Sequence, residues 1–198
     1  MDDSSDRSER LAPAVASPSD PRPGLPGLID RYLGPDATTL DGLRVGIAAL
    51  GGLLLGLLTV PAPPAERLLL ALLTAELCAG LMAALNHAGK SWIHRPARRL
   101  PRLLLFVALQ TIPMALFIWL FRGQDLALLG NAVALLFLGG AAVLITPSAW
   151  QRAIGLLLLL GVLFALQHFH SQAPAAAWFL PLVYTRTFLA HLPSPRPG

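Results

Sequence analysis

Long apolar runs alternate with short polar segments along most of this chain. Six runs lie at about 43–60, 65–86, 101–121, 126–145, 153–170 and 174–192. An α-helix needs roughly 20 apolar residues to span about 30 Å of hydrocarbon, and most of these runs approach that length. The pattern therefore predicts an all-α, polytopic transmembrane helix bundle of six helices within residues 42–193. Five helices are the alternative, because Arg186 interrupts the last run and Pro181 is expected to bend it.

The polar ends of the chain predict little regular structure. Residues 1–41 are expected to form a disordered N-terminal tail, since the stretch up to about residue 27 is rich in Ser, Pro and Asp and lacks periodicity. Within this tail, an apolar stripe at helical spacing predicts one or two helical turns lying on the membrane surface, with a solvated turn as the alternative. The stripe consists of Leu28, Ile29, Tyr32 and Leu33. Residues 194–198 are expected to form a C-terminal tail.

Local signals predict where several helices begin and end. Thr38 and Asp41 have the spacing of a capping box, in which each side chain binds the backbone N–H of the other residue. Prolines at 61, 63 and 64 end the first apolar run. Pro113 is expected to kink the third run, because it removes the hydrogen bond to the carbonyl of Leu109.

Composition supports a membrane environment. Hydrophobic residues make up 55% of the chain and charged residues 13%, against about 25% charged residues in a typical soluble domain. The net charge of +4 does not indicate nucleic-acid binding, because the basic residues lie at the ends of apolar runs, where lipid headgroups attract them. The predicted partners are the lipid bilayer and either a second copy of the chain or another membrane protein.

The loop between the second and third runs predicts the orientation in the membrane. It contains five basic residues and no acidic one: Lys90, Arg95, Arg98, Arg99 and Arg102. Such a loop stays in the cytoplasm under the positive-inside rule, and these side chains are expected to contact lipid headgroups. With six spans, both termini are then cytoplasmic. The excess of Arg over Lys and the abundance of Ala, Gly and Pro indicate a GC-rich genome, hence a bacterial inner membrane.

Three polar residues inside the apolar runs form a candidate intramembrane site: Glu76, Gln110 and Asn131. A carboxylate near the middle of a membrane helix costs about 2.5 to 3.5 kcal/mol, so Glu76 is expected to be protonated or paired inside the bundle. Gln110 is at a similar depth and could hydrogen-bond to it. One hypothesis is a proton or cation site. The alternative is an interhelical hydrogen bond that stabilises the bundle.

Metal and catalytic signatures are weak in this sequence. His87, His94 and His191 lie at the predicted inner face, and His87 and His191 are the secondary candidates for a metal site. No HExxH or GxSxG pattern occurs, and no cofactor is predicted. Small residues recur every four positions in the first two runs, a spacing that lets helices approach closely. They are Ala48, Gly52 and Gly56 in the first run, and Ala71, Ala75, Ala79 and Ala83 in the second.

Three functions remain open at this point. The favoured hypothesis is a multi-pass membrane protein without chemistry of its own, acting as a scaffold, assembly factor or accessory subunit. The second is a small-solute or proton transporter or channel component that uses Glu76. The third is an intramembrane enzyme that uses the inner-face histidines.

Overall fold

The computed structural model describes residues 20–95, 99–169 and 176–194, and this part of the chain is helical without any strand. The prediction of an all-α helix bundle is confirmed. Four stretches are long and apolar enough to cross a membrane: Thr39–Thr59, Pro64–Leu85, Leu100–Phe121 and Leu126–Ile145. A shorter apolar stretch follows at Gln151–Gln167.

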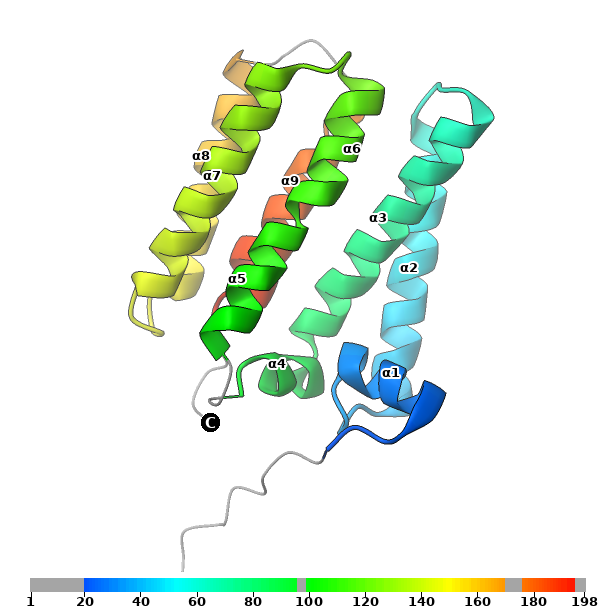
Figure 1. The fold of residues 1–198 in the computed structure, drawn as a ribbon, viewed down its shortest axis with the longest axis vertical. Helices are drawn as coiled ribbons and strands as arrows, with labels where there is room; N and C mark the ends of the chain where they lie inside the picture. The colour runs from blue at the N-terminus through cyan, green and yellow to red at the C-terminus, as the bar shows by residue number, and fades with distance from the viewer. Residues whose placement is uncertain (1–19, 96–98, 170–175, 195–198) are drawn as a thin grey trace, which may run out of the picture.

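The helices follow the predicted runs closely (Figure 1). In chain order they are α1 (Gly24–Leu33), α2 (Thr39–Thr59), α3 (Pro64–Leu85), α4 (His87–Ile93), α5 (Arg99–Leu109), α6 (Thr111–Phe121), α7 (Leu126–Ile145), α8 (Gln151–Phe169), α9 (Phe179–Thr185) and the π-helix η4 (Arg186–His191). Helices α2 and α3 form one antiparallel pair, α7 and α8 form another, and α5 and α6 run end to end between them. The short helices α1 and α4 lie together at one end of the bundle.

The predicted N-terminal signals of α1 and α2 are largely correct. The apolar stripe at 28–33 forms part of α1, which begins earlier than expected, at Gly24. Asp30 accepts hydrogen bonds from the backbone N–H and the guanidinium of Arg22, and this contact joins the start of α1 to its last turn. The capping box of Thr38 and Asp41 is present at the start of α2. Residues 1–19 and 195–198, predicted to form tails, lie outside the described residues.

The two predicted proline bends have different outcomes. The third apolar run is divided at Gln110 into α5 and α6, close to the carbonyl that Pro113 leaves without its usual donor. Pro181, in contrast, lies in the first turn of α9, where no amide donor is needed, so it does not bend that helix. The last run instead widens into a π-turn, in which the N–H of Leu192 donates to the carbonyl of Thr187 at 3.0 Å.

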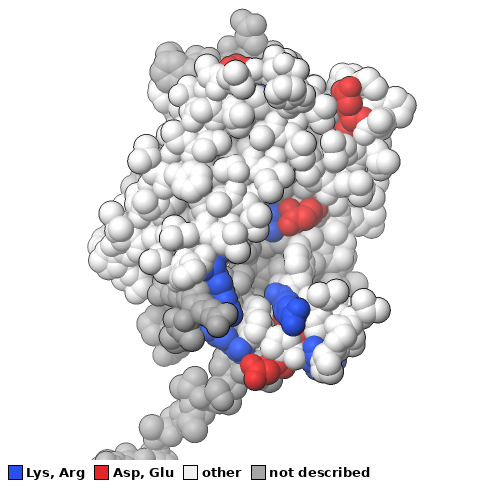
Figure 2. Space-filling model, viewed as in Figure 1, with Lys and Arg blue, Asp and Glu red and all other residues white. Residues whose placement is uncertain are grey.

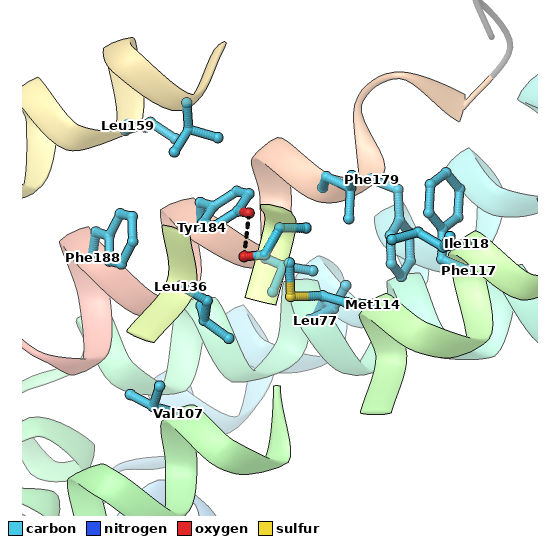
Figure 3. Close-up of a cluster of buried hydrophobic side chains, with 14 of the residues drawn as sticks. Leu77, Val107, Met114, Phe117, Ile118, Leu136, Leu159, Phe179, Tyr184 and Phe188 are labelled. Atoms are coloured by element: carbon cyan, nitrogen blue, oxygen red, sulfur yellow. Dashed lines mark hydrogen bonds between the residues drawn. The ribbon is translucent and has the colours of Figure 1, made fainter. Parts of the chain in front are cut away.

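The last apolar run is the centre of the bundle. Helices α9 and η4 lie behind α5 and α6 in Figure 1 and contact α3, α6, α7 and α8. Phe179, Tyr184 and Phe188 are completely buried, and the Tyr184 hydroxyl donates to the carbonyl of Ala132 at 2.8 Å (Figure 3). By contrast, large apolar side chains on α2, α5, α7 and α8 point outward. The least apolar run is therefore surrounded by protein, while the more apolar runs have faces suited to lipid.

The small residues of the first two membrane helices, whose spacing predicted close helix packing without naming the partner, face each other in the structure. A Cβ atom on Gly52 would lie 2.6 Å from the carbonyl oxygen of Thr74, and one on Gly56 would overlap the backbone of Ala71. Both glycines are buried. The absence of side chains at these positions lets the backbones of α2 and α3 approach each other along their length.

Candidate functional site

An ion pair joins α3 to the central helix. The two terminal nitrogens of Arg186 donate to the two carboxylate oxygens of Glu76, with Nη1–Oε2 at 2.6 Å and Nη2–Oε1 at 2.7 Å. This fork-to-fork geometry is the strongest arrangement for an arginine and a carboxylate. Glu76 lies near the middle of α3, which runs from Pro64 to Leu85. Because a single charge costs several kcal/mol at this depth, each residue neutralises the other where water is scarce.

The surroundings of Arg186 hold its guanidinium in one place. Gly80, one turn after Glu76 on α3, packs directly against the guanidinium, and a Cβ atom there would overlap it. The ring of Phe106 lies 5.4 Å from the guanidinium carbon, within the range of a cation–π contact. The Arg186 side chain is 6% exposed, whereas that of Glu76 is 53% exposed. The arginine is therefore buried, and the carboxylate forms the accessible side of the pair.

A second group of polar side chains lies nearer to the end of the bundle formed by α1 and α4. The ring of His191 stacks on Phe106 with 3.6 Å between ring centroids. Lys90 donates from Nζ to the carbonyl of Ala190 at 3.1 Å, and Nε2 of His94 lies 2.9 Å from the carbonyl oxygen of His191. Two carbonyls at the end of the π-helix have no partner within that helix, and they contact Lys90 of α4 and His94, the residue that follows α4.

An open pocket of about 490 Å³ lies beside this group. Its lining comes from the N-terminal segment, α1, α4, α5 and η4: Pro21, Arg31, Trp92, Ile93, Arg102, Phe106 and His191. Arg31 and Arg102 are exposed, and the Arg102 guanidinium lies 5.6 Å from the ring of Trp92. Neighbouring Arg95 lies over the same ring at 4.0 Å and also contacts Asp20.

The three predicted intramembrane polar residues have different environments. Glu76 pairs with Arg186 rather than with Gln110. Gln110 is 5% exposed, and its Oε1 has no hydrogen-bond partner among the described residues. Asn131 is exposed on α7. No hydrogen bond between described residues joins these three side chains.

The predicted metal candidates are also separate. His87 is exposed at the start of α4, while His191 is buried against Phe106. His94, not His87, contacts the end of η4. Within residues 20–95, 99–169 and 176–194, no cluster of three or more His, Cys, Asp or Glu side chains could hold a metal ion.

The basic loop residues are distributed over several environments. Lys90 is buried and points into the bundle, where burial, with a smaller contribution from Arg152, lowers the pKa of its ammonium group to about 8. Arg95 is partly buried, and Arg102 is exposed. Arg98 and the side chain of Arg99 lie outside the described part of the structure.

The pairing of Arg186 with Glu76 is a feature that the sequence pattern did not predict. A signal was present, because an arginine inside one apolar run and a glutamate near the middle of another would each be costly alone. The two residues are 110 positions apart, so only their depth in the membrane could have linked them. Comparisons with protein-family models, with curated proteins and with solved structures find no match to this chain.

Proposed function

We propose that this chain is a multi-pass integral membrane protein without a reaction of its own, acting as a scaffold, assembly factor or accessory subunit. The observation that carries this proposal is the bidentate Glu76–Arg186 pair. A transporting carboxylate must be free to exchange a proton or cation for its partner, whereas both carboxylate oxygens of Glu76 are engaged by an arginine that is itself enclosed by Gly80 and Phe106. The pair is therefore better suited to fixing the central helix than to moving a solute.

The proposed topology has six spans with both termini in the cytoplasm of a bacterial inner membrane. The burial of α9 and η4 among the other helices supports a sixth span, since it puts this segment inside the bundle. The end of the bundle with α1 and α4 also carries Lys90, Arg95 and Arg102, which favours the cytoplasm on that side. Reporter fusions after Ser171 and at Gly198 should report opposite sides of the membrane. A common side for both would reduce the count to five.

The exposed side of the Glu76 carboxylate indicates where a partner of this scaffold would bind. A half-exposed carboxylate at this depth is poorly solvated by lipid chains. A polar or cationic side chain from a neighbouring membrane helix, whether from a second copy or another protein, would complete its hydrogen bonding. We therefore expect a partner to contact the face of α3 that presents Glu76.

Substitutions of the pair distinguish scaffolding from transport. The variants E76Q and R186Q and the charge exchange E76R/R186E are purified and reconstituted into vesicles that contain a pH-sensitive dye. A scaffold predicts no proton flux in the wild type, a lower melting temperature in each single variant, and partial recovery in the exchange. Proton flux in the wild type that disappears in a folded E76Q protein would overturn the proposal and favour the transporter.

A partner is tested separately. The wild type is solubilised mildly from its native membrane, and the proteins that copurify with it are identified. The expected result is a stable complex, and site-specific photo-crosslinking from Leu72 or Leu68 on exposed positions of α3 should label the partner. Crosslinks confined to lipid from both positions, with no copurifying protein and a monomeric mass, would contradict the scaffold proposal.

A further inference from the structure

The pocket between α1, α4 and α5 has the chemistry of a site for a phosphate-bearing anion. Arg31 and Arg102 reach it from two different helices, and the residues that line it include no carboxylate. Asp20, which adjoins the pocket residue Pro21, contacts Arg95. Two guanidinium groups from separate elements can surround a phosphate with several donors, which is a typical way for arginine to bind this group.

A buried group provides independent evidence for a ligand. His191 lines the pocket at 9% exposure, and its Nδ1 atom has no hydrogen-bond partner in the described part of the chain. A buried polar nitrogen without a partner is costly, so a ligand that reaches this nitrogen on settling into the pocket would be stabilised by the new hydrogen bond. The ring itself is held by its stack on Phe106, so its position is defined before a ligand arrives.

The position of the pocket favours a lipid over a soluble phosphate. Arg102, Phe106 and Leu109 follow one another at helical spacing along α5, and Leu105 lies on the neighbouring stripe. Leu105 is 60% exposed and Leu109 is 49% exposed, so an apolar surface continues from the pocket toward the middle of the membrane. A molecule with a phosphate at one end and acyl chains at the other would match a basic pocket that continues into an apolar helix face.

Trp92 fits the same arrangement. It lines the pocket together with Arg31 and Arg102, and the Arg102 guanidinium lies 5.6 Å from its ring. Figure 2 shows basic side chains gathered at one end of the bundle. Tryptophan is enriched at the level of lipid headgroups because its ring is apolar and its N–H is polar. Basic pockets between membrane helices on the cytoplasmic side are a known type of site for anionic headgroups.

We propose that the pocket lined by Arg31, Trp92, Arg102 and His191 binds the headgroup of an anionic phospholipid, with the acyl chains lying along Leu105 and Leu109 of α5. The phosphate contacts the two arginines, and a headgroup hydroxyl or phosphate oxygen meets His191. The lipid thereby joins the surface helix α1 to α4 and α5. This inference is independent of whether the protein acts as a scaffold or a transporter.

The test is native mass spectrometry of the delipidated full chain, titrated with phosphatidylglycerol, phosphatidylcholine, glycerol phosphate or inorganic phosphate. We expect phosphatidylglycerol to bind at least about tenfold more tightly than phosphatidylcholine, which corresponds to about 1.4 kcal/mol. The variant R31Q/R102Q should lose this preference. The matched control R44Q/R152Q removes the same charge from exposed positions outside the pocket and should retain it.

A second variant tests the buried histidine. H191F keeps a ring to stack on Phe106 and removes Nδ1, so it should weaken phosphatidylglycerol binding several-fold without changing the affinity for phosphatidylcholine. Equal binding of the two lipids by the wild type would overturn the proposal. So would an equal loss of preference in R31Q/R102Q and R44Q/R152Q, because the effect would then be general surface attraction.

Two further measurements identify the source of the phosphate and keep the proposal testable if a variant misfolds. Inorganic phosphate or glycerol phosphate binding as tightly as phosphatidylglycerol would refute a lipid site in favour of a soluble anion. If R31Q/R102Q does not fold, the wild type is photo-crosslinked with a phosphatidylglycerol that carries a diazirine in its acyl chain. Adducts should concentrate in residues 100–109, and adducts spread evenly over the lipid-facing helices would reject the site.

Discussion

Gly80 lies directly against the guanidinium of Arg186, so that a methyl group on residue 80 would overlap its Nη2 and Cζ atoms. Glu76 is one turn earlier on the same face of α3 and accepts hydrogen bonds from both terminal nitrogens of that guanidinium. The bidentate pair therefore depends on a carboxylate at one position and on the absence of a side chain at the other.

The first prediction concerns this dependence. G80A should lower the free energy of unfolding by about 2 to 3 kcal/mol, since displacing the guanidinium weakens a charge-assisted pair and leaves buried donors unsatisfied. Thermal unfolding in detergent measures the effect. The control is G51A, because Gly51 lies on α2 with open space around it. That change should be neutral or stabilising by up to about 1 kcal/mol, and an equal loss in both variants would contradict the role of Gly80.

A second prediction tests the contact between α2 and α3. G56V places a branched side chain against the backbone of Ala71, and overpacking of this kind costs about 1 to 3 kcal/mol. The comparison is G46V on the same helix, where nothing lies near the added atoms. Melting temperatures of the two variants should differ clearly, with G56V the lower. Similar values would mean that the two helices can separate without cost.

The third prediction uses Lys90, which is the only lysine in the chain. Burial lowers its pKa from 10.5 to about 8 in the folded protein. The unfolded state therefore binds more protons between these values, and the contribution of Lys90 to stability rises as the pH increases from about 8 to about 10.5. Below pH 8, Lys90 is charged in both the folded and the unfolded state. The full free-energy cost of burying its ammonium group then lowers the stability of the folded protein.

The pH dependence of the melting temperature checks this sign. The wild type should gain stability relative to K90M as the pH rises from 8 toward 10. The difference between the two proteins removes contributions from tyrosine and cysteine, which both share. A constant difference over this range would show that the ammonium group is not perturbed by folding.

The fourth prediction concerns the start of α1. Hydrogen bonds from Arg22 hold the pKa of Asp30 at about 2, below its ordinary value of 3.8. The contact therefore contributes to the folding of this segment fully above pH 3.8, and the contribution is lost as the pH falls through about 2. The carboxyl carbon of Asp30, followed by NMR, should titrate near 2 in the wild type and closer to 3.8 in R22Q. Identical midpoints would exclude the pairing in solution.

Much of the fold follows from local chemistry that the sequence displays. The capping box of Thr38 and Asp41 depends on residues three positions apart, and the glycine contacts of α2 with α3 join neighbouring helices. These features are predictable because the interacting groups are close along the chain. The α-helical bundle itself follows from apolar runs of suitable length.

The arrangement around Arg186 was harder to predict for a physical reason. Its partners Glu76, Gly80 and Phe106 come from two other helices, and their choice depends on how the bundle packs. Hydropathy also misrepresents the last run, because a helix surrounded by protein does not need an apolar residue at every position. The residue that weakened the prediction of a sixth span is thus the one that ties this segment to α3.

The central position of α9 and η4 has a consequence for biosynthesis. Glu76 is synthesised 110 residues before Arg186, which takes roughly 5 to 20 s at about 5 to 20 residues per second. During this interval the nascent chain has an unpaired carboxylate and no helix to fill the middle of the bundle. The helices made earlier therefore stay loosely packed or bound to a chaperone until Arg186 is inserted. Chains stalled on the ribosome between positions 76 and 186 should be degraded by membrane proteases.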